Sequence, residues 1–154
     1  MKPVSAWSLV ALQFFFIAAL VVLPQGGLWP GGTLVTVLGG VLVSVGVAIG
    51  LAAVLRLGRT LTPSPIPRED GHLETTGVYA WARHPIYTAL LTLSLGLVVW
   101  GASTGHVVVF VFLSMLLGLK ARAEEKMLFT KYEAYAEYAA RVGRFFPGIG
   151  LLKK

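Results

Sequence analysis

The stretch GGTLVTVLGGVLVSVGVAIGLAAVL at residues 31–55 decides the fold class, because it is long and apolar and contains no charged side chain. A helix of about 20 apolar residues is enough to span the hydrocarbon core of a bilayer. Small residues recur four positions apart, as Gly40 with Ser44 and Gly46 with Gly50, a spacing that lets another helix approach closely. Glycine is common in membrane helices in any case, so the pattern predicts a span but no oligomer.

Three further uncharged runs share this character, at residues 6–23, 85–102 and 106–119. The first holds one amide, Gln13, and exceeds the usual apolar core of a signal peptide, about 7 to 15 residues, so we expect it to be retained. Pro85 suits the first position of a helix, where its missing amide hydrogen costs nothing. The short turn at residues 101–105 predicts a hairpin between the last two runs.

Composition supports a membrane protein. Of the 154 residues, 56% are hydrophobic and 13% are charged, whereas soluble domains carry about 25% charged residues. The formal charge of +6 comes from basic residues that flank the apolar runs, which indicates membrane orientation and not nucleic-acid binding. The chain has no cysteine, so disulfides, a thiolate nucleophile and cysteine metal sites are excluded.

The charged residues collect on one side of the predicted bundle. Every Lys, Arg, Asp and Glu lies before the first run, in the loop at 56–83, or from residue 120 onward. Four spans bring these regions to one membrane face, and the positive-inside bias makes that face cytoplasmic. We therefore expect an integral, multi-pass, all-α membrane protein with about four transmembrane helices and a C-terminal cytoplasmic amphipathic helix.

The loop at residues 56–83 ends in a cluster of reactive side chains. Loops of this length are usually functional or disordered. The strings HLETTGVY at 72–79 and RHPIY at 83–87 place two imidazoles, a guanidinium and two phenols around one helix N-terminus. Such an N-terminus suits a carboxylate or phosphate. The alternative is that Arg83 and the tyrosines simply anchor the helix at the membrane interface.

A second cluster, KARAEE at residues 120–125, lies where the fourth span leaves the membrane. Helical spacing predicts ion pairs of Lys120 with Glu124 and of Arg122 with Glu125. The alternative is a pair of adjacent carboxylates beside a cationic ligand. The helical period continues to about residue 142, with an apolar face that we expect to lie on the membrane or on the protein.

Three blocks together resemble the isoprenylcysteine carboxyl methyltransferase family and its bacterial relatives, within the membrane phospholipid-methyltransferase group. They are TPSPIP at 62–67, the region 72–87 with its RHPIY string, and the region 124–148, with paired glutamates, Tyr135, Tyr138, Arg141 and Pro147-Gly148. The resemblance implies one membrane methyltransferase domain over residues 1–154. Its two-span part is 1–57, and residues 58–154 supply a cofactor-binding loop, the hairpin and the C-terminal helix.

The resemblance also implies that S-adenosylmethionine is the cofactor. The residues expected to bind it are His72, Leu73, Tyr79, Arg83, His84, Pro85, Tyr87 and Glu124. The family pattern has a substrate-binding arginine one helical turn before the glutamate, where this chain has Lys120, with Arg122 two residues later. We expect Lys120 and Arg122 to bind the substrate and Arg122, Glu124 and Glu125 to be catalytic.

The reaction that this resemblance implies is carboxyl O-methylation of a lipidic or prenylated acceptor, either a small molecule or a protein. A phospholipid amine is the alternative acceptor, and a non-catalytic membrane helper is the alternative class. Metal ligation by His72 and His84 is weakly supported, because His106 is expected on the other side and no cysteine is present, so no metal is expected. No nucleic-acid partner is expected.

Overall fold

The structure, a computed structural model, describes residues 3–58, 61–62 and 71–152, and these residues form helices and loops without a strand. The helices are α1 (Pro3–Val22), α2 (Thr33–Leu57), the 3-10 turn η2 (Gly77–Ala80), α3 (Pro85–Gly101), α4 (Thr104–Lys131) and α5 (Tyr135–Arg141). The four long helices match the four apolar runs, and the all-helical class is as expected.

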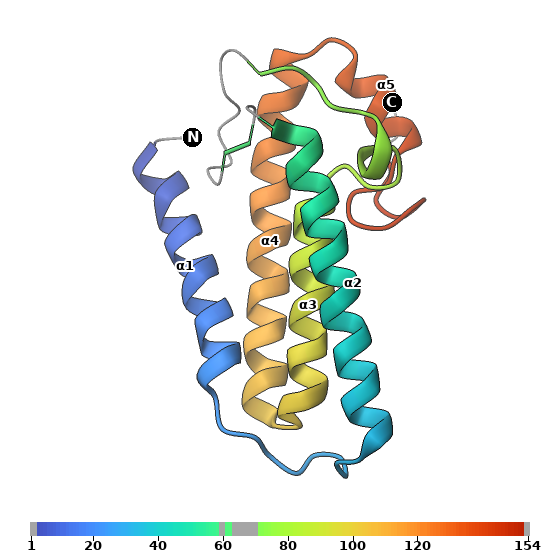
Figure 1. The fold of residues 1–154 in the computed structure, drawn as a ribbon. Helices are drawn as coiled ribbons and strands as arrows, with labels where there is room; N and C mark the ends of the chain where they lie inside the picture. The colour runs from blue at the N-terminus through green and yellow to red at the C-terminus, as the bar shows by residue number, and fades with distance from the viewer. Residues whose placement is uncertain (1–2, 59–60, 63–70, 153–154) are drawn as a thin grey trace.

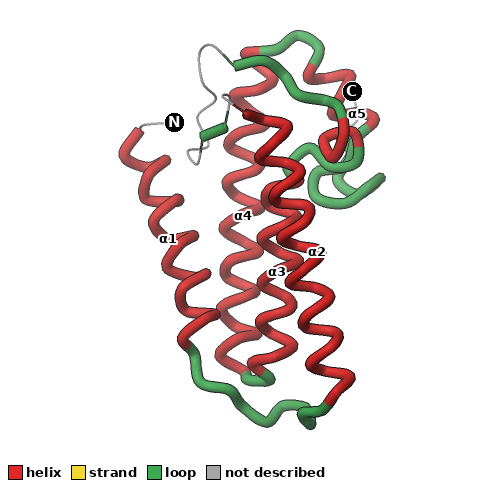
Figure 2. The backbone as a smooth tube through the Cα atoms, in the orientation of Figure 1, coloured by secondary structure: helices red, strands yellow, loops and turns green. Residues whose placement is uncertain are grey.

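The four long helices stand side by side in the order α1, α4, α3, α2 (Figure 1). The α1–α2 connection and the α3–α4 turn lie at one end of this bundle, whereas the start of α1 and the short helix α5 lie at the other (Figures 1 and 2). This up-and-down arrangement brings the loop after α2, the start of α3 and the end of α4 together. The charged regions therefore gather at a single end.

Glycines allow α2 and α3 to pack closely. A Cβ atom on Gly46 would lie 2.7 Å from the backbone nitrogen of Leu93, and one on Gly39 would lie 2.3 Å from the indole nitrogen of Trp100. At Gly40 the nearest atom of the same ring is 3.8 Å away, so that position is less crowded. The small residues of α2 thus serve a contact within this chain, as close helix packing in membranes requires.

The boundaries of α3 and α4 follow local sequence signals. Pro85 is the first residue of α3, directly after the N-cap His84, and the helix ends at Ala102 in the left-handed conformation with φ 43°. The Ser103 side chain caps α4 by accepting a hydrogen bond from the backbone nitrogen of His106, 3.3 Å away. These two adjacent caps make the expected hairpin turn.

Two helices, α2 and α4, are long and apolar enough to cross a membrane, with mean hydropathies of 2.5 and 1.8 over their most apolar windows. The apolar parts of α1 and α3 are shorter. Large side chains on α2 are exposed, among them Leu34 at 79% and Leu55 at 79%, which is unfavourable in water and suits hydrocarbon. Four spans stay a prediction on this ground.

The segment after Lys120 is not one continuous helix. α4 ends at Lys131, Tyr132 is extended with φ −125°, and α5 has 7 residues. The Tyr132 hydroxyl donates to the Gly71 carbonyl oxygen at 2.7 Å, which holds the chain at this break. The buried side chains of α5, Tyr135, Tyr138 and Ala139, pack against Leu73 and Leu128, so this apolar face lies on the protein.

Candidate active site

A pocket of about 460 Å³ lies at the charged end of the bundle, within the range of about 300 to 1,000 Å³ that is usual for small-molecule sites. Residues of α1, α2, α3, α4 and α5 and of the segment 71–79 line it. Its lining includes these predicted residues: His72, Leu73, Tyr79, Arg83, His84, Pro85, Tyr87, Lys120 and Glu124. Arg122 and Glu125 are not among the lining residues.

His84, Tyr87 and Glu124 form the polar centre of this pocket. Pro85 starts α3 between the first two, so the His84 and Tyr87 rings stack with centroids 5.4 Å apart. Nδ1 of His84 is 3.1 Å from Oε2 of Glu124, and the Tyr87 hydroxyl donates to Oε1 of the same carboxylate. The carboxylate of Glu124 is thereby fixed in orientation by two side chains of α3.

The pKa of His84 is raised above its usual value. Burial by itself lowers the pKa of an imidazole, but contacts with the carboxylates of Glu124 and Glu125 outweigh that effect. Nε2 of His84 faces Oε1 of Glu125 at 3.4 Å without a hydrogen bond among the described residues. The imidazole therefore favours its protonated form, which counterbalances the two adjacent glutamates.

Glu125 has a different environment from its neighbour Glu124. It is 4% exposed, and its Oε1 accepts hydrogen bonds from Nε and Nη2 of Arg83 at 2.9 and 2.7 Å. Its Oε2 accepts from Nη2 of Arg144 at 2.7 Å. A buried carboxylate needs such partners. Glu125 thus joins α4 to the segment before α3 and to the segment after α5, and it does not line the pocket.

Arg83 lines the pocket, yet its donors are bound to the protein. Besides Glu125, Nη1 donates to the carbonyl oxygens of Ala139, at 3.0 Å, and Val142, and Nη2 donates to that of Gly150 at 2.9 Å. A buried guanidinium requires this satisfaction of its donors. Arg83 therefore connects the start of α3 to the C-terminal segment, and its guanidinium is bound by the protein itself.

The segment 71–79 forms the outer wall of the pocket. The Tyr138 hydroxyl donates to the Tyr79 carbonyl oxygen at 2.6 Å. Glu74 accepts hydrogen bonds from the backbone nitrogen and hydroxyl of Thr76, at 2.8 and 2.5 Å, and these bonds lower the pKa of its carboxyl. The His72 side chain is 66% exposed at the rim, 3.7 Å from Glu74. Of the TPSPIP block, 63–67 lie outside the described residues.

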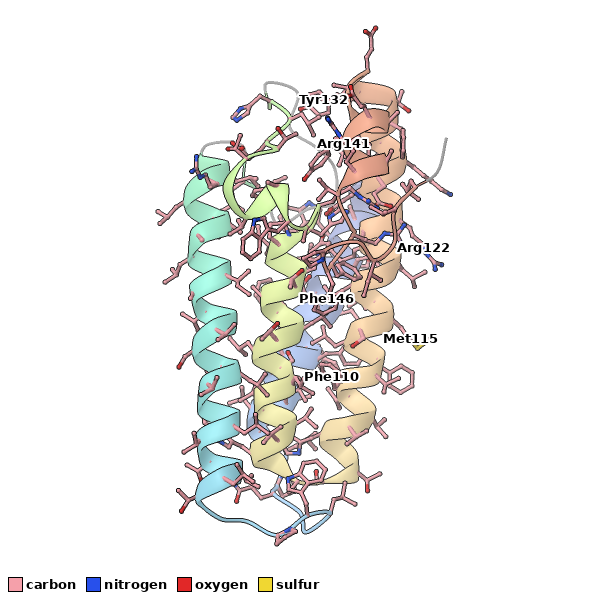
Figure 3. The ribbon with its side chains drawn as sticks, turned by 90° about the vertical axis from the view of Figure 1, so that its right-hand side faces the viewer. Phe110, Met115, Arg122, Tyr132, Arg141 and Phe146 are labelled. Atoms are coloured by element: carbon pink, nitrogen blue, oxygen red, sulfur yellow. The ribbon has the colours of Figure 1, made fainter. Side chains whose placement is uncertain are left out.

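The ion pairs expected within residues 120–125 are not formed. Lys120 is 1% exposed, and its Nζ donates to Oε1 of Gln13 on α1 at 2.6 Å and lies 5.3 Å from the centroid of the Tyr87 ring. Arg122 is exposed, and Figure 3 shows its side chain pointing away from the bundle. Glu125 turns inward to two other arginines. Burial of one face of α4, which the helical spacing alone does not specify, causes the difference.

The sequence analysis did not single out three residues of this region as site residues: Gln13, Arg144 and Tyr135. Gln13 carried a usable signal, because a single amide in an apolar run is usually functional or paired. Arg144 had none, since no spacing links it to Glu125. The Tyr135 hydroxyl is buried in the pocket lining and has no hydrogen-bond partner among the described residues.

The tyrosines and Glu124 form a part of the lining that suits a positively charged group of a ligand. All five tyrosines of the chain line the pocket: Tyr79, Tyr87, Tyr132, Tyr135 and Tyr138. Aromatic faces attract cations, and the Glu124 carboxylate adds to that attraction. The described residues contain no cluster of three or more His, Asp or Glu side chains placed to hold a metal ion. Organic cations are the better match to this chemistry.

Fold and site together define a class: a bundle of long apolar helices with a tyrosine-lined polar pocket at one end. Residues 34–135 match the phospholipid methyltransferase family, and the chain belongs to that family. The predicted resemblance is thereby confirmed. The matched region starts in α2, so α1 lies outside it.

The chain is also similar to individual proteins with different names. The chain is 35% identical over 109 residues to the cobalt-zinc-cadmium resistance protein CzcN of Cupriavidus metallidurans, covering 68% of this chain and 48% of that protein. It is 33% identical over 120 residues to the protein-S-isoprenylcysteine O-methyltransferase of Saccharomyces cerevisiae, covering 75% and 50%. The chain thus spans about half the length of these relatives.

A solved structure shares the fold. The eukaryotic intramembrane Ras methyltransferase, an isoprenylcysteine carboxyl methyltransferase, superposes with a TM-score of 0.69 at 24% sequence identity. The likeness covers 97% of this chain and 52% of the other. The arrangement of the helices is therefore one that a membrane methyltransferase uses.

Proposed function

We propose that this chain is an S-adenosylmethionine-dependent methyltransferase that acts on a lipidic acceptor at the cytoplasmic face of a membrane. The observation that carries the proposal is the Glu124 carboxylate, held by His84 and Tyr87 inside a tyrosine-lined pocket. Membership of the phospholipid methyltransferase family and the name of the Saccharomyces cerevisiae relative support the reaction class.

The residues present fit the cofactor. Tyrosine rings suit a sulfonium and an ammonium, and the Glu124 carboxylate can accept hydrogen bonds from an ammonium or a ribose hydroxyl. The buried hydroxyl of Tyr135 has no hydrogen-bond partner among the described residues. When bound, S-adenosylmethionine supplies a methyl group on a sulfonium, and transfer to an ionised carboxylate requires no proton transfer. The chain's task is then to hold two ligands in line.

The acceptor is expected to be lipidic because the pocket has an apolar side. Phe14 and Ile17 of α1, Val54 of α2 and Leu90 of α3 line it, and these helices continue toward the proposed bilayer. Four spans with the pocket at the cytoplasmic end follow from the one-sided charge distribution. An acyl or prenyl chain can occupy this apolar side while its polar end lies near Lys120.

A carboxylate is the acceptor that the pocket favours, as in carboxyl O-methylation of an isoprenylcysteine-type substrate. A C-terminal carboxyl has a reference pKa of about 3.3 to 3.7, so it is ionised at neutral pH and needs no base. The buried ammonium of Lys120 suits such an anion. A phospholipid amine, the alternative acceptor, has to lose a proton before it can be methylated, which an ionised carboxylate does not.

Calorimetric titration of detergent-purified protein with S-adenosylmethionine tests the first half of this proposal. We expect saturable one-site binding, and its absence in folded protein would favour a non-catalytic membrane helper. Transfer of labelled methyl groups to a prenylated cysteine and to a phospholipid amine tests the second half. Activity toward the amine alone, rising with pH as free amine appears, would refute the carboxylate assignment.

A further inference from the structure

α1 contributes a polar group to the pocket although it lies outside the region that matches the family. This group is the amide of Gln13, which is 9% exposed and lines the pocket beside Phe14 and Ile17. Its Oε1 accepts a hydrogen bond from Nζ of Lys120 at 2.6 Å. Two helices far apart in the sequence thus meet at one buried ammonium.

The ammonium of Lys120 has no protein counter-ion at contact distance. Among the described residues, no carboxylate lies within 4.0 Å of Nζ. Glu124, one helical turn away, is directed toward His84 and Tyr87. Burying an unpaired charge is unfavourable, so the pocket is best completed by an anion from a ligand.

Lys120 also has donors to spare. An ammonium carries three N–H groups, and Gln13 is the one hydrogen-bond acceptor that Nζ has among the described residues. Because Oε1 of Gln13 accepts this bond, the amide nitrogen of the same side chain is a further donor in the pocket wall. The pair therefore presents donors, and no negative charge, to a ligand.

We propose that Gln13 is a positioning residue that holds Nζ of Lys120, and that through it α1 sets the preference for a negatively charged acceptor. The inference rests on the proposed function. It adds which residues make the protein prefer a negatively charged acceptor over a neutral one. Nζ lies 5.3 Å from the centroid of the Tyr87 ring, whose hydroxyl donates to Glu124. The ring of Tyr87 thus lies between an anion bound at Lys120 and Glu124, the residue proposed to bind the cofactor.

The test compares binding of two ligands that differ only in charge, a prenylated cysteine with a free carboxylate and the same compound as its neutral carboxamide. Both are titrated into protein saturated with S-adenosylhomocysteine. Gln13→Glu places a carboxylate against Lys120 and neutralises it, so affinity for the free acid should fall about tenfold or more. Affinity for the carboxamide and for the cofactor should change little.

Two further variants keep the test decisive if Gln13→Glu folds poorly. Lys120→Met removes the charge and should make the two ligands bind equally, and Gln13→Leu should reduce the preference for the acid by releasing Nζ. Lys126→Gln, which changes the net charge by the same amount as Gln13→Glu at an exposed position of α4, is the matched control and should retain the preference.

Kinetics of methyl transfer give an independent readout. A positioning role predicts that Gln13→Glu raises KM for the acid acceptor more than it lowers kcat. Equal loss of both ligands in Gln13→Glu and Gln13→Leu would show a packing role and refute the inference, as would an unchanged preference. If the wild-type protein binds no cofactor, the proposed function fails and this inference fails with it, whereas normal cofactor binding with unchanged preference refutes the inference alone.

Discussion

At the scale of single residues, adjacent charges in α4 have separate tasks. Glu124 faces the pocket, where His84 and Tyr87 hold it, whereas Glu125 faces two arginines behind the wall. Because successive helical residues differ by about 100° in direction, neighbours in sequence contact different parts of the protein. Glu124 is therefore the glutamate in the pocket lining, and Glu125 is the one that joins chain segments through arginines.

Replacing either partner in the pocket centre should weaken cofactor binding. We expect His84→Ala and Glu124→Ala each to raise the Kd for S-adenosylmethionine about tenfold or more, since each removes a charged or oriented hydrogen-bonding group. Glu137→Ala is the control, because Glu137 is exposed and pairs with Arg141 at 3.3 Å on the outer surface of α5. Calorimetry measures all three, and equal losses would contradict the placement.

The raised pKa of His84 predicts a pH dependence of stability. The folded protein binds this proton more tightly than the unfolded chain, whose imidazole has a pKa of about 6.5. The stabilisation is fully present below that pH and is lost as the pH rises through the raised value. The difference in Tm between wild type and His84→Gln in detergent should therefore shrink on going to alkaline pH; a difference that grows would contradict the protonated state.

At the scale of elements, the contact of α2 with α3 depends on glycines that remove side-chain bulk. The backbone oxygen of Ala89 and the backbone nitrogen of Leu93 lie 2.9 and 2.7 Å from the place of a Gly46 Cβ, and backbone atoms cannot move aside as a flexible side chain can. α3 carries His84 and Tyr87 at its start, so this contact also positions the pocket. Packing along the first half of α3 thus supports the site.

Gly46→Leu should separate these helices and destabilise the protein by about 1 to 3 kcal/mol, the usual cost of overpacking. Gly118→Leu is the matched control on α4, because nothing lies within 4 Å of the Cβ position there. Thermal unfolding in detergent compares the two variants. If the Gly46→Leu protein were as stable as the Gly118→Leu protein, the α2–α3 contact would accommodate the larger side chain without loss of stability, and the prediction would be wrong.

At the scale of the whole molecule, the bundle separates an apolar body from one polar end. The loops between α1 and α2 and between α3 and α4 carry no charged residue, and the opposite end holds the pocket (Figure 1). This asymmetry is what a membrane protein with a single reactive face requires. In the proposed orientation, the cofactor would be in reach of the cytoplasm and the acceptor in reach of the lipid.

Cysteine labelling tests this orientation. The chain has no native cysteine, so single cysteines at Gly27 and Lys154 can be labelled without a background. With four spans, we expect a membrane-impermeant reagent to reach position 27 from outside intact cells and position 154 only after the membrane is opened. Labelling of both positions from the same side would contradict four spans.

The sequence by itself determined the all-helical class, the four apolar helices and the end of the bundle at which the charged side chains lie. These properties are local, since they depend on runs of apolar residues, on Pro85 as a helix start and on charges at helix ends. The string RHPIY with the paired glutamates also sufficed to identify the family. Each of these features can be seen without knowing which helices touch.

The tertiary structure alone decided how each helix is turned about its axis. Helical spacing puts Lys120 and Glu124 on one face of α4 and Arg122 on another, but it does not say which face meets the pocket. Contact with α1 and α3 settles this: Lys120 meets Gln13 and the ring of Tyr87, while Arg122 is exposed. The hydrogen bond between Gln13 and Lys120 joins two residues that are 107 positions apart in the sequence, and only the packing of α1 against α4 brings them together.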